Sequence, residues 1–205
     1  MLRARIAVLV SGGGTNLQAL IDAQKDGRIR NGEIVLVISN KCDAFALKRA
    51  ESARIKTSVI EKSGRTQDEF EYGILKVLAE NDIDLIILAG FMSILSKRFV
   101  SHYKDRIINV HPSLIPSFCG KGFYGLKVHE AVLSYGVKVT GATVHFVNEI
   151  PDGGKIIMQK AVEVSDSDTP ETLQRKVMEE AEWKILPQAT ETVCRHIVKE
   201  KNHDI

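Results

Sequence analysis

The stretch RIAVLVSGGGTN, residues 5–16, decides the fold of this chain. Five apolar residues follow Arg5 without a break, which is typical of a strand buried on both faces of a sheet. Three glycines come next, and Thr15 and Asn16 are residues that favour the start of a helix. A strand, a glycine turn and a helix in direct succession indicate an α/β unit built on a parallel sheet.

The same alternation continues along the chain. Apolar runs predict further strands at residues 33–39, 57–60, 84–89 and 106–110. Segments rich in helix formers predict helices at residues 16–24, 43–53 and 67–80, and a shorter one at 127–134. Residues 138–147 and 155–164 predict two strands that pair antiparallel across a turn at 148–154.

A last helix starts at Thr169-Pro170-Glu171 and runs towards His196, with a kink or break expected at Pro187. Together these elements predict an α/β fold. We expect a Rossmann-like, mostly parallel twisted sheet with helices on both faces and antiparallel strands in the C-terminal part.

Length and charge narrow the class of protein. The chain has 205 residues, and 28 basic against 26 acidic residues give a net charge of +2. We therefore expect one domain over residues 1–205, with a phosphate-binding half at about 1–100 and a catalytic half at about 101–205. The charge balance favours no nucleic-acid partner, and no apolar segment reaches membrane-spanning length. Three scattered cysteines without a C-x-x-C pair favour a cytoplasmic protein.

The segment Ser11–Asn16 is the first candidate for chemistry. Glycines let backbone N–H groups approach an anion, and the start of a helix favours negative charge. Leu17 breaks the G-x-G-x-x-G dinucleotide pattern, and no Gly-Lys-Ser/Thr follows, so a Walker A loop is excluded. A plain tight turn is the alternative, but it needs fewer glycines, and we favour a phosphate site.

Asn109 and His111 form the second candidate. Residues two apart on a strand share a face, so both side chains should point together at the carboxyl end of a strand, where ligands of α/β sheets bind. An amide and an imidazole there suit oxyanion stabilisation and proton transfer. A capping Asn and a satisfied, partly buried His explain the segment equally well.

Other polar residues are weaker candidates. Asp152 lies in a Pro-Asp-Gly turn, which alone indicates only a turn, although a carboxylate reaching His111 would orient that ring and favour its charged form. His145 lies on a strand and is as consistent with a core edge as with function. A metal site using His111, His145, Asp152 or Cys119 has no supporting ligand spacing.

Five motifs taken together carry a resemblance over residues 5–195. They are SGGGTNLQALIDA (11–23), LAGFMSILS (88–96), INVHPSLIPSF (108–118), GATVHFVNEIPDGG (141–154) and EEAEWKILP (179–187). The chain resembles the phosphoribosylglycinamide formyltransferase family, the folate-dependent glycinamide ribonucleotide transformylases of purine biosynthesis. This resemblance implies formyl transfer from 10-formyltetrahydrofolate to glycinamide ribonucleotide, with no metal, in a monomer or homodimer whose partners are small molecules.

The resemblance also implies residue roles. Asn109, His111 and Asp152 match the family's catalytic trio, and Asn109 also lies on the folate side. The substrate-phosphate site is matched by Gly14, Thr15 and Asn16, and a nucleotide-contacting acid by Glu182. The implied folate-binding residues are Arg65, Met92, Ser93, Ile94, Leu95, Asn148, Glu149, Ile150 and Pro151. Ser93 stands where family members often have arginine, and the loop at 119–124 differs from shorter family forms.

Two related families and one unrelated class are the alternatives. The 10-formyltetrahydrofolate hydrolases usually carry an extra N-terminal domain, and the methionyl-tRNA formyltransferases carry an extra C-terminal domain and need a basic surface. We expect neither in a chain of 205 residues with a net charge of +2. A non-catalytic binding protein would keep the glycine segment without needing Asn109, His111 and Asp152 together.

Overall fold

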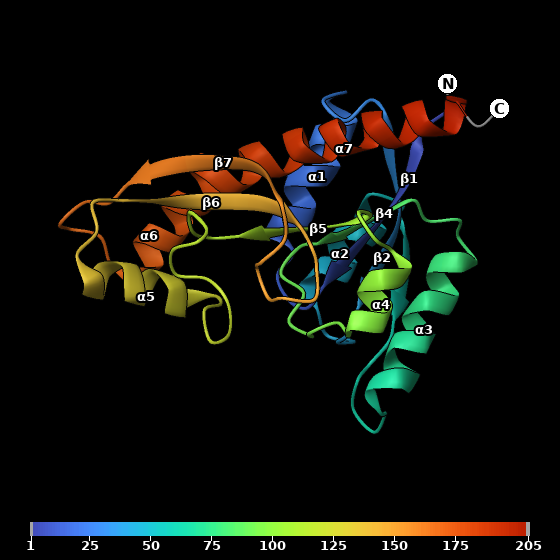
Figure 1. Cartoon of the computed structure of the whole chain (residues 1–205), viewed down its shortest axis with the longest axis horizontal. Helices are drawn as coiled ribbons and strands as arrows, with labels where there is room; N and C mark the ends of the chain where they lie inside the picture. The colour runs from blue at the N-terminus through green and yellow to red at the C-terminus, as the bar shows by residue number, and fades with distance from the viewer. Residues whose placement is uncertain (1, 204–205) are drawn as a thin grey trace.

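A computed structural model describes residues 2–203 of the chain. Its seven strands form one sheet in the order β3-β2-β1-β4-β5-β6-β7 (Figure 1). The strands are β1 (Ala4–Val10), β2 (Gly32–Ser39), β3 (Lys56–Val59), β4 (Leu85–Leu88), β5 (Ile107–His111), β6 (Val139–Phe146) and β7 (Ile156–Glu163). Strands β1 to β5 run parallel, whereas β6 pairs antiparallel with β5 and β7 with β6. The predicted mostly parallel sheet with a C-terminal antiparallel part is confirmed.

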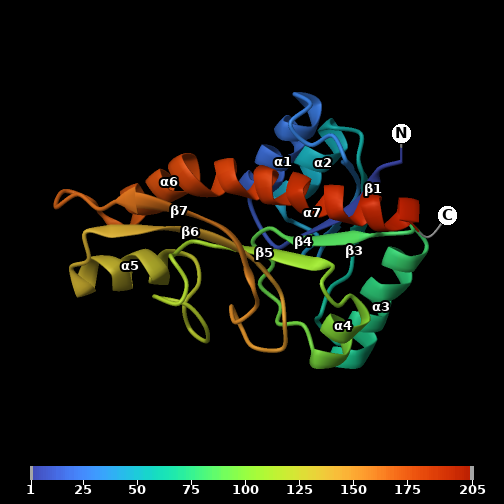
Figure 2. The same ribbon diagram turned by 45° about the horizontal axis from the view of Figure 1, so that its top comes forward.

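Helices cover both faces of the sheet, as predicted (Figure 2). One face packs against α1 (Thr15–Lys25), α2 (Phe45–Ser52), α6 (Pro170–Val177) and α7 (Trp183–His203). The other packs against α3 (Gln67–Ala79) and α4 (Lys97–His102). Helix α5 (Leu126–Tyr135) lies against α6.

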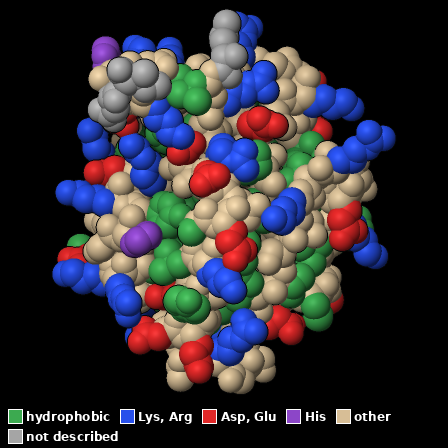
Figure 3. Space-filling model, turned by 90° about the vertical axis from the view of Figure 1, so that its right-hand side faces the viewer, with side chains coloured by type: hydrophobic (Ala, Val, Ile, Leu, Met, Phe, Trp, Pro, Cys, Tyr) green, Lys and Arg blue, Asp and Glu red, His purple; other side chains and the backbone are tan. Residues whose placement is uncertain are grey.

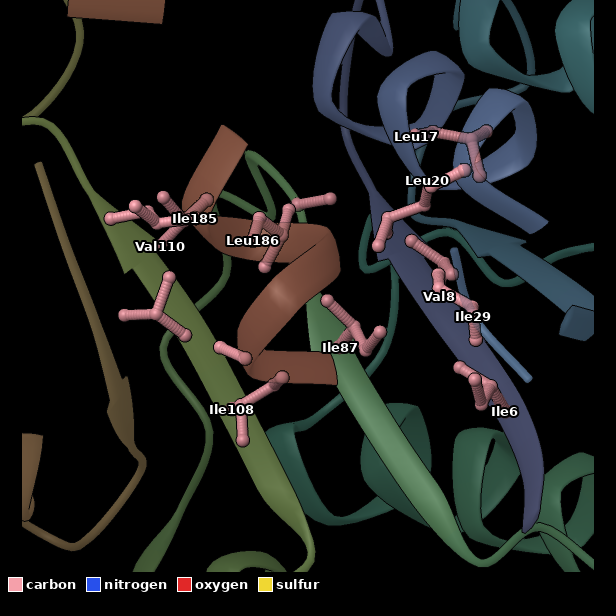
Figure 4. Close-up of a cluster of buried hydrophobic side chains, with 14 of the residues drawn as sticks. Ile6, Val8, Leu17, Leu20, Ile29, Ile87, Ile108, Val110, Ile185 and Leu186 are labelled. Carbon is pink, nitrogen blue, oxygen red and sulfur yellow. The ribbon is translucent and has the colours of Figure 1, made fainter. Parts of the chain in front are cut away.

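Strand β1 explains why the opening segment specifies the fold. Ile6, Val8 and Val10 belong to the core on the α1 and α7 side, whereas Ala7 and Leu9 belong to the core on the α3 side. Figure 4 shows part of the first core, with side chains from three strands, two helices and the connection between α1 and β2: Ile6, Val8, Ile87, Ile108, Val110, Leu17, Leu20, Ile185, Leu186 and Ile29. A strand inside two cores needs apolar residues at every position, not at alternate ones.

The strand order reverses between β1 and β4. The chain goes from β1 outward to β3, then returns to β4 on the other side of β1. Ligands of open α/β sheets bind at such a switch point, outside the carboxyl ends of the strands. Here the backbone N–H of Met92, after β4, donates to Ser11 Oγ, after β1, at 2.8 Å. The glycine segment and the segment after β4 therefore lie side by side at the switch point.

Two local features differ from the sequence prediction. Residues 97–102 form α4, which is too short to show a helical period in the sequence; Ser96 Oγ caps it by accepting from the Phe99 N–H at 3.2 Å. Of the kink or break expected at Pro187, the break is wrong, since Pro187 lies inside α7. The helix is irregular earlier, in a π-helical turn, η1 (Met178–Glu182), which directly precedes α7. Proline has no backbone N–H, so the carbonyl four residues before Pro187, in the first turn of α7, receives no helical hydrogen bond from it.

Charged side chains of both signs are interspersed over the face that carries the two termini (Figure 3). This mixture agrees with the small net charge of the chain. Within residues 2–203, no helix combines the length and apolarity needed to cross a bilayer.

Candidate active site

Asn109 and His111 lie at the carboxyl end of β5, on the face opposite Ile108 and Val110. Strand β6 runs antiparallel beside them, and its register places His145 opposite Asn109. The Asn109 Nδ2 and His145 Nε2 atoms are 3.3 Å apart. The two residues predicted to share a face therefore do so, and the neighbouring strand adds a third polar side chain.

Asp152 reaches this strand end from the loop at 148–154. The loop is held by its own hydrogen bonds, since Asn148 Oδ1 accepts from the Ile150 N–H and Asn148 Nδ2 donates to the Gly153 carbonyl. Asp152 itself has a φ of 55°, a left-handed conformation that aspartate tolerates better than most residues. At Gly154 an added Cβ would lie 1.7 Å from the Phe146 carbonyl oxygen, so only glycine fits.

Asp152 bridges the two histidines. Its Oδ2 atom lies 3.5 Å from His111 Nδ1, and its Oδ1 atom lies 3.5 Å from His145 Nε2. The Gly120 N–H also donates to Oδ2, at 2.9 Å. We call Asn109, His111, His145 and Asp152 the strand-end cluster. The structure thus brings together the three predicted catalytic residues.

The neighbouring acceptors show which nitrogens of the two histidine rings carry hydrogen. His111 Nε2 lies 2.9 Å from the Phe118 carbonyl, and His145 Nδ1 lies 2.8 Å from the Phe146 carbonyl. Carbonyls only accept, so both nitrogens carry hydrogen. His145 Nε2, the other nitrogen of that ring, lies 3.3 Å from Asn109 Nδ2 and 3.5 Å from Asp152 Oδ1. His111 faces a carbonyl on one side and a carboxylate on the other, an arrangement that a doubly protonated ring satisfies fully.

Asp152 is a stable counter-charge for these rings. Burial alone raises its pKa, but the long hydrogen bond from His145, the charge of His111 and the Gly120 N–H outweigh that effect and hold the pKa below its usual value. The carboxylate therefore stays charged at neutral pH.

The loop at 112–125 covers His111, which is only 5% exposed. The Phe118 carbonyl accepts a hydrogen bond from His111 Nε2. Within the same loop, Ser113 Oγ donates to the Ser117 carbonyl at 2.6 Å. Cys119 follows Phe118, and burial with the nearby charge of Asp152 raises the pKa of its thiol. The thiol is thus disfavoured as a thiolate nucleophile.

A cavity of about 140 Å³ opens beside the cluster. Apolar side chains line most of it, and Asn109, His145 and Asp152 supply polar atoms. Its lining includes these residues predicted to bind folate: Ser93, Ile94, Leu95, Asn109, Asn148, Glu149, Ile150 and Pro151. The structure therefore gathers segments more than fifty residues apart into one wall.

Two of the predicted folate residues lie outside this lining. Met92 is 54% exposed next to it, and Arg65 is exposed in the turn before α3. Two residues further on, at the start of α3, Gln67 Nε2 donates to the Ile94 carbonyl at 3.0 Å.

The glycine segment lies at the neighbouring switch point. Gly14 has a φ of 73°, and an added Cβ would meet the Ala46 Cβ at 2.6 Å, so this glycine is required by packing. Gly12 and Gly13 face open space. Packing does not explain these two glycines, whereas close approach of a ligand to the backbone would.

Asn16 and Glu182, which are both predicted to contact the nucleotide substrate, lie next to each other at the start of α1. Asn16 Nδ2 donates to Glu182 Oε2 at 2.5 Å, and Thr15 Oγ1 lies 3.7 Å from Met178 Sδ. Glu182 ends the π-helical turn, a conformation often found at functional sites. Burial raises the pKa of Glu182 to about 6, although the Asn16 hydrogen bond lowers it in part.

Replacing Glu182 by glutamine should stabilise the unliganded protein at pH 8 but not at pH 4. Below pH 4.5 the carboxyl is protonated in both the folded and the unfolded chain. As the pH rises through about 6, the folded state must also carry a buried charge and loses stability. A move from 4.5 to about 6 corresponds to roughly 2 kcal/mol, at about 1.36 kcal/mol for each tenfold change.

Urea unfolding at both pH values measures this difference. Glu180→Gln is the matched control, because Glu180 lies exposed on the same turn and should show no such dependence. An equal effect of Glu182→Gln at pH 4 and pH 8 would show that the buried charge does not limit stability.

Sequence reasoning left one member of the cluster undecided. His145 lies between Asn109 and Asp152. Only the register of β5 against β6 brings it there, and no local pattern in the sequence encodes that register. Among the described residues, the structure contains no group of three or more His, Cys, Asp or Glu side chains arranged to hold a metal ion.

Comparisons with known proteins identify the family of the chain. A family model described as formyl transferase matches residues 4–190. The phosphoribosylglycinamide formyltransferase of Haemophilus influenzae is 40% identical over 184 residues, which are 89% of this chain and 84% of that protein. A crystal structure of glycinamide ribonucleotide transformylase 1 from Symbiobacterium toebii superposes with a TM-score of 0.88 at 38% identity, covering 95% of this chain and 89% of that one.

The human trifunctional purine biosynthetic protein adenosine-3 is 46% identical over 198 residues, which are 96% of this chain and 19% of that protein. The chain thus spans about a fifth of the length of its trifunctional relatives. It spans most of the single-enzyme relative and of the solved structure. The chain belongs to the formyl transferase family and, within it, to the phosphoribosylglycinamide formyltransferases.

Proposed function

We propose that the protein transfers the formyl group of 10-formyltetrahydrofolate to the amine of glycinamide ribonucleotide. The products are N-formylglycinamide ribonucleotide and tetrahydrofolate, and the reaction belongs to de novo purine biosynthesis. The observation that carries the proposal is the strand-end cluster, in which Asp152 bridges two histidines beside Asn109 at the edge of a mostly apolar cavity. Family membership supports the same reaction.

The cluster suits the charges of formyl transfer. When the substrate amine attacks the formyl carbon, negative charge develops on the formyl oxygen. The Asn109 amide and a protonated His111 are two donors on one strand face that would stabilise this oxyanion. The carbon–N10 bond then breaks, the amine loses a proton and N10 gains one. Asp152, charged at neutral pH and next to both rings, would help to carry that proton.

The glycine segment would hold the phosphate of the nucleotide. Gly14, Thr15 and Asn16 form the start of α1, where free backbone N–H groups and the helix dipole favour an anion. Glu182, within reach of Asn16, would accept a hydrogen bond from a sugar hydroxyl. The nucleotide would then span from α1 to the strand-end cluster.

The folate would occupy the cavity lined by the segments after β4 and β6. Ile94, Leu95 and Ile150 offer apolar walls for a flat ring system, and the backbone of the loop at 148–154 offers polar atoms. Met92 and Arg65 lie outside the lining and would contact the exposed end of the molecule.

The loop at 112–125 would have to release His111 before catalysis. Its Nε2 hydrogen now points to the Phe118 carbonyl, at 2.9 Å. A formyl oxygen stabilised by the same hydrogen would replace that carbonyl. The direct test of the function is whether tetrahydrofolate release from 10-formyltetrahydrofolate depends on glycinamide ribonucleotide.

A further inference from the structure

We propose that Arg49 of α2 is a positioning residue for the phosphate of the nucleotide substrate. It would act by holding the glycine segment in the orientation that exposes its N–H groups. This inference rests on the proposed function, because it assumes that the phosphate binds at Gly14, Thr15 and Asn16. It extends that function to a residue on a separate helix, 33 or more positions further along the chain.

Helix α2 binds the carbonyl side of the glycine segment. The Ala46 N–H donates to the Gly12 carbonyl at 3.0 Å, and Arg49 Nε donates to the Gly13 carbonyl at 2.8 Å. Within a trans peptide the C=O of one residue and the N–H of the next point in opposite directions. The N–H groups of Gly13 and Gly14 therefore point away from α2.

These N–H groups are unused by the rest of the protein. Within the part of the chain that the structure describes, the backbone N–H groups of Gly13, Gly14, Thr15 and Asn16 have no hydrogen-bond acceptor. Successive free N–H groups on one side of a segment form a concave anion site. Arg49 thus fixes one of the two peptide planes that create this site.

Arg49 is itself held in place. Its Nη1 atom donates to Gln18 Oε1 at 3.1 Å, and its guanidinium lies 5.0 Å from the centre of the Phe45 ring. It is partly buried, and it borders a cavity of about 290 Å³ with Thr15 and Trp183. Because the planar guanidinium also contacts Gln18 and Phe45, its orientation is fixed. It therefore restricts the orientation of the Gly13 carbonyl more than a flexible ammonium would.

Side-chain packing does not hold Gly12 or Gly13 in place. Added Cβ atoms at Gly12 and Gly13 would meet nothing within 4 Å, so neither residue is locked by packing. Glycine also has the greatest backbone freedom of all residues. Without the Arg49 hydrogen bond, the Gly13–Gly14 peptide would be free to rotate, and its N–H would leave the anion site.

Arg49→Leu tests this role with glycinamide ribonucleotide and with the same molecule lacking its phosphate. With the phosphorylated substrate, KM should rise about tenfold, the size expected for one lost hydrogen bond from a charged group, whereas kcat should stay within about twofold. With the unphosphorylated molecule, kcat/KM should equal that of the wild type. Arg49→Lys keeps the charge and one donor and should recover part of the loss.

Arg28→Leu is the matched control. Arg28 borders the same cavity, but its side chain is 53% exposed and pairs with Asp26, not with the glycine segment. Its KM should match the wild type. If Arg49→Leu lowered kcat/KM equally for both substrates, or left the KM for the phosphorylated substrate unchanged, the proposal would be overturned.

Inorganic phosphate separates this inference from the proposed function. Titration calorimetry should show phosphate binding to the wild type and to Arg28→Leu, with about tenfold weaker binding to Arg49→Leu. Should the wild type fail to formylate glycinamide ribonucleotide yet show this pattern, the function would be wrong and the role of Arg49 would stand. Equal phosphate affinity in all three proteins would refute the role of Arg49 and leave the proposed function untouched.

Discussion

Replacing His111 by alanine should lower kcat for formyl transfer by about 10²–10³-fold, the usual effect of removing one oxyanion donor. The imidazole is fixed between the Phe118 carbonyl and Asp152, so alanine removes a donor that the fold holds in place. Asn109 would remain as a donor on the same strand face, which is why a residual rate should persist. The measurement is single-turnover formation of the formylated nucleotide.

His102→Ala is the control for this substitution. His102 is exposed on α4 and contacts Tyr103 through its ring, away from the strand-end cluster. It should retain wild-type kcat. A fall in kcat of less than about tenfold for His111→Ala, well below the usual effect of one donor, would show that His111 is not an oxyanion donor.

Asp152→Asn should lower kcat by about 10²–10³-fold, within the range for a group that assists proton transfer. The shape of the residue is kept, so the hydrogen bond from the Gly120 N–H can persist. What disappears is the negative charge 3.5 Å from both His111 and His145. The pH–rate profile should therefore change shape as well as height.

Steady-state rates across the pH range test this coupling, with Asp166→Asn as the control. Asp166 forms an exposed pair with Lys138, and its side chain is 90% exposed. Its profile should overlay that of the wild type. A profile for Asp152→Asn that keeps the wild-type shape would refute the coupling between the carboxylate and the histidines.

Much of this arrangement follows from local sequence. The parallel core of the sheet could be predicted because β4 and residues 6–10 of β1 are apolar throughout, as strands inside two cores must be. Asn109 and His111 could be placed together because a strand repeats every two residues. The cap at Thr169 could also be predicted, and its Oγ1 accepts from the Thr172 N–H.

The remaining features depend on contacts between distant segments. His145 enters the cluster through the β5–β6 register, and Asp152 enters through a loop shaped by Gly154 and Asn148. Arg49 reaches Gly13 only because α2 packs beside α1. The residues of the π-helical turn upstream of Pro187 do not differ in type from those of an ordinary α-helix. Each of these requires the packed structure, because no periodicity encodes it.

The most direct test of the proposed function is to incubate the purified protein with 10-formyltetrahydrofolate, with and without glycinamide ribonucleotide. Tetrahydrofolate release and formylated nucleotide are measured together. Formyl transfer predicts release only with the nucleotide present, in equal amounts with the formylated product. Release at the same rate without the nucleotide would indicate hydrolysis instead, and no release in either case would leave a binding protein without this activity.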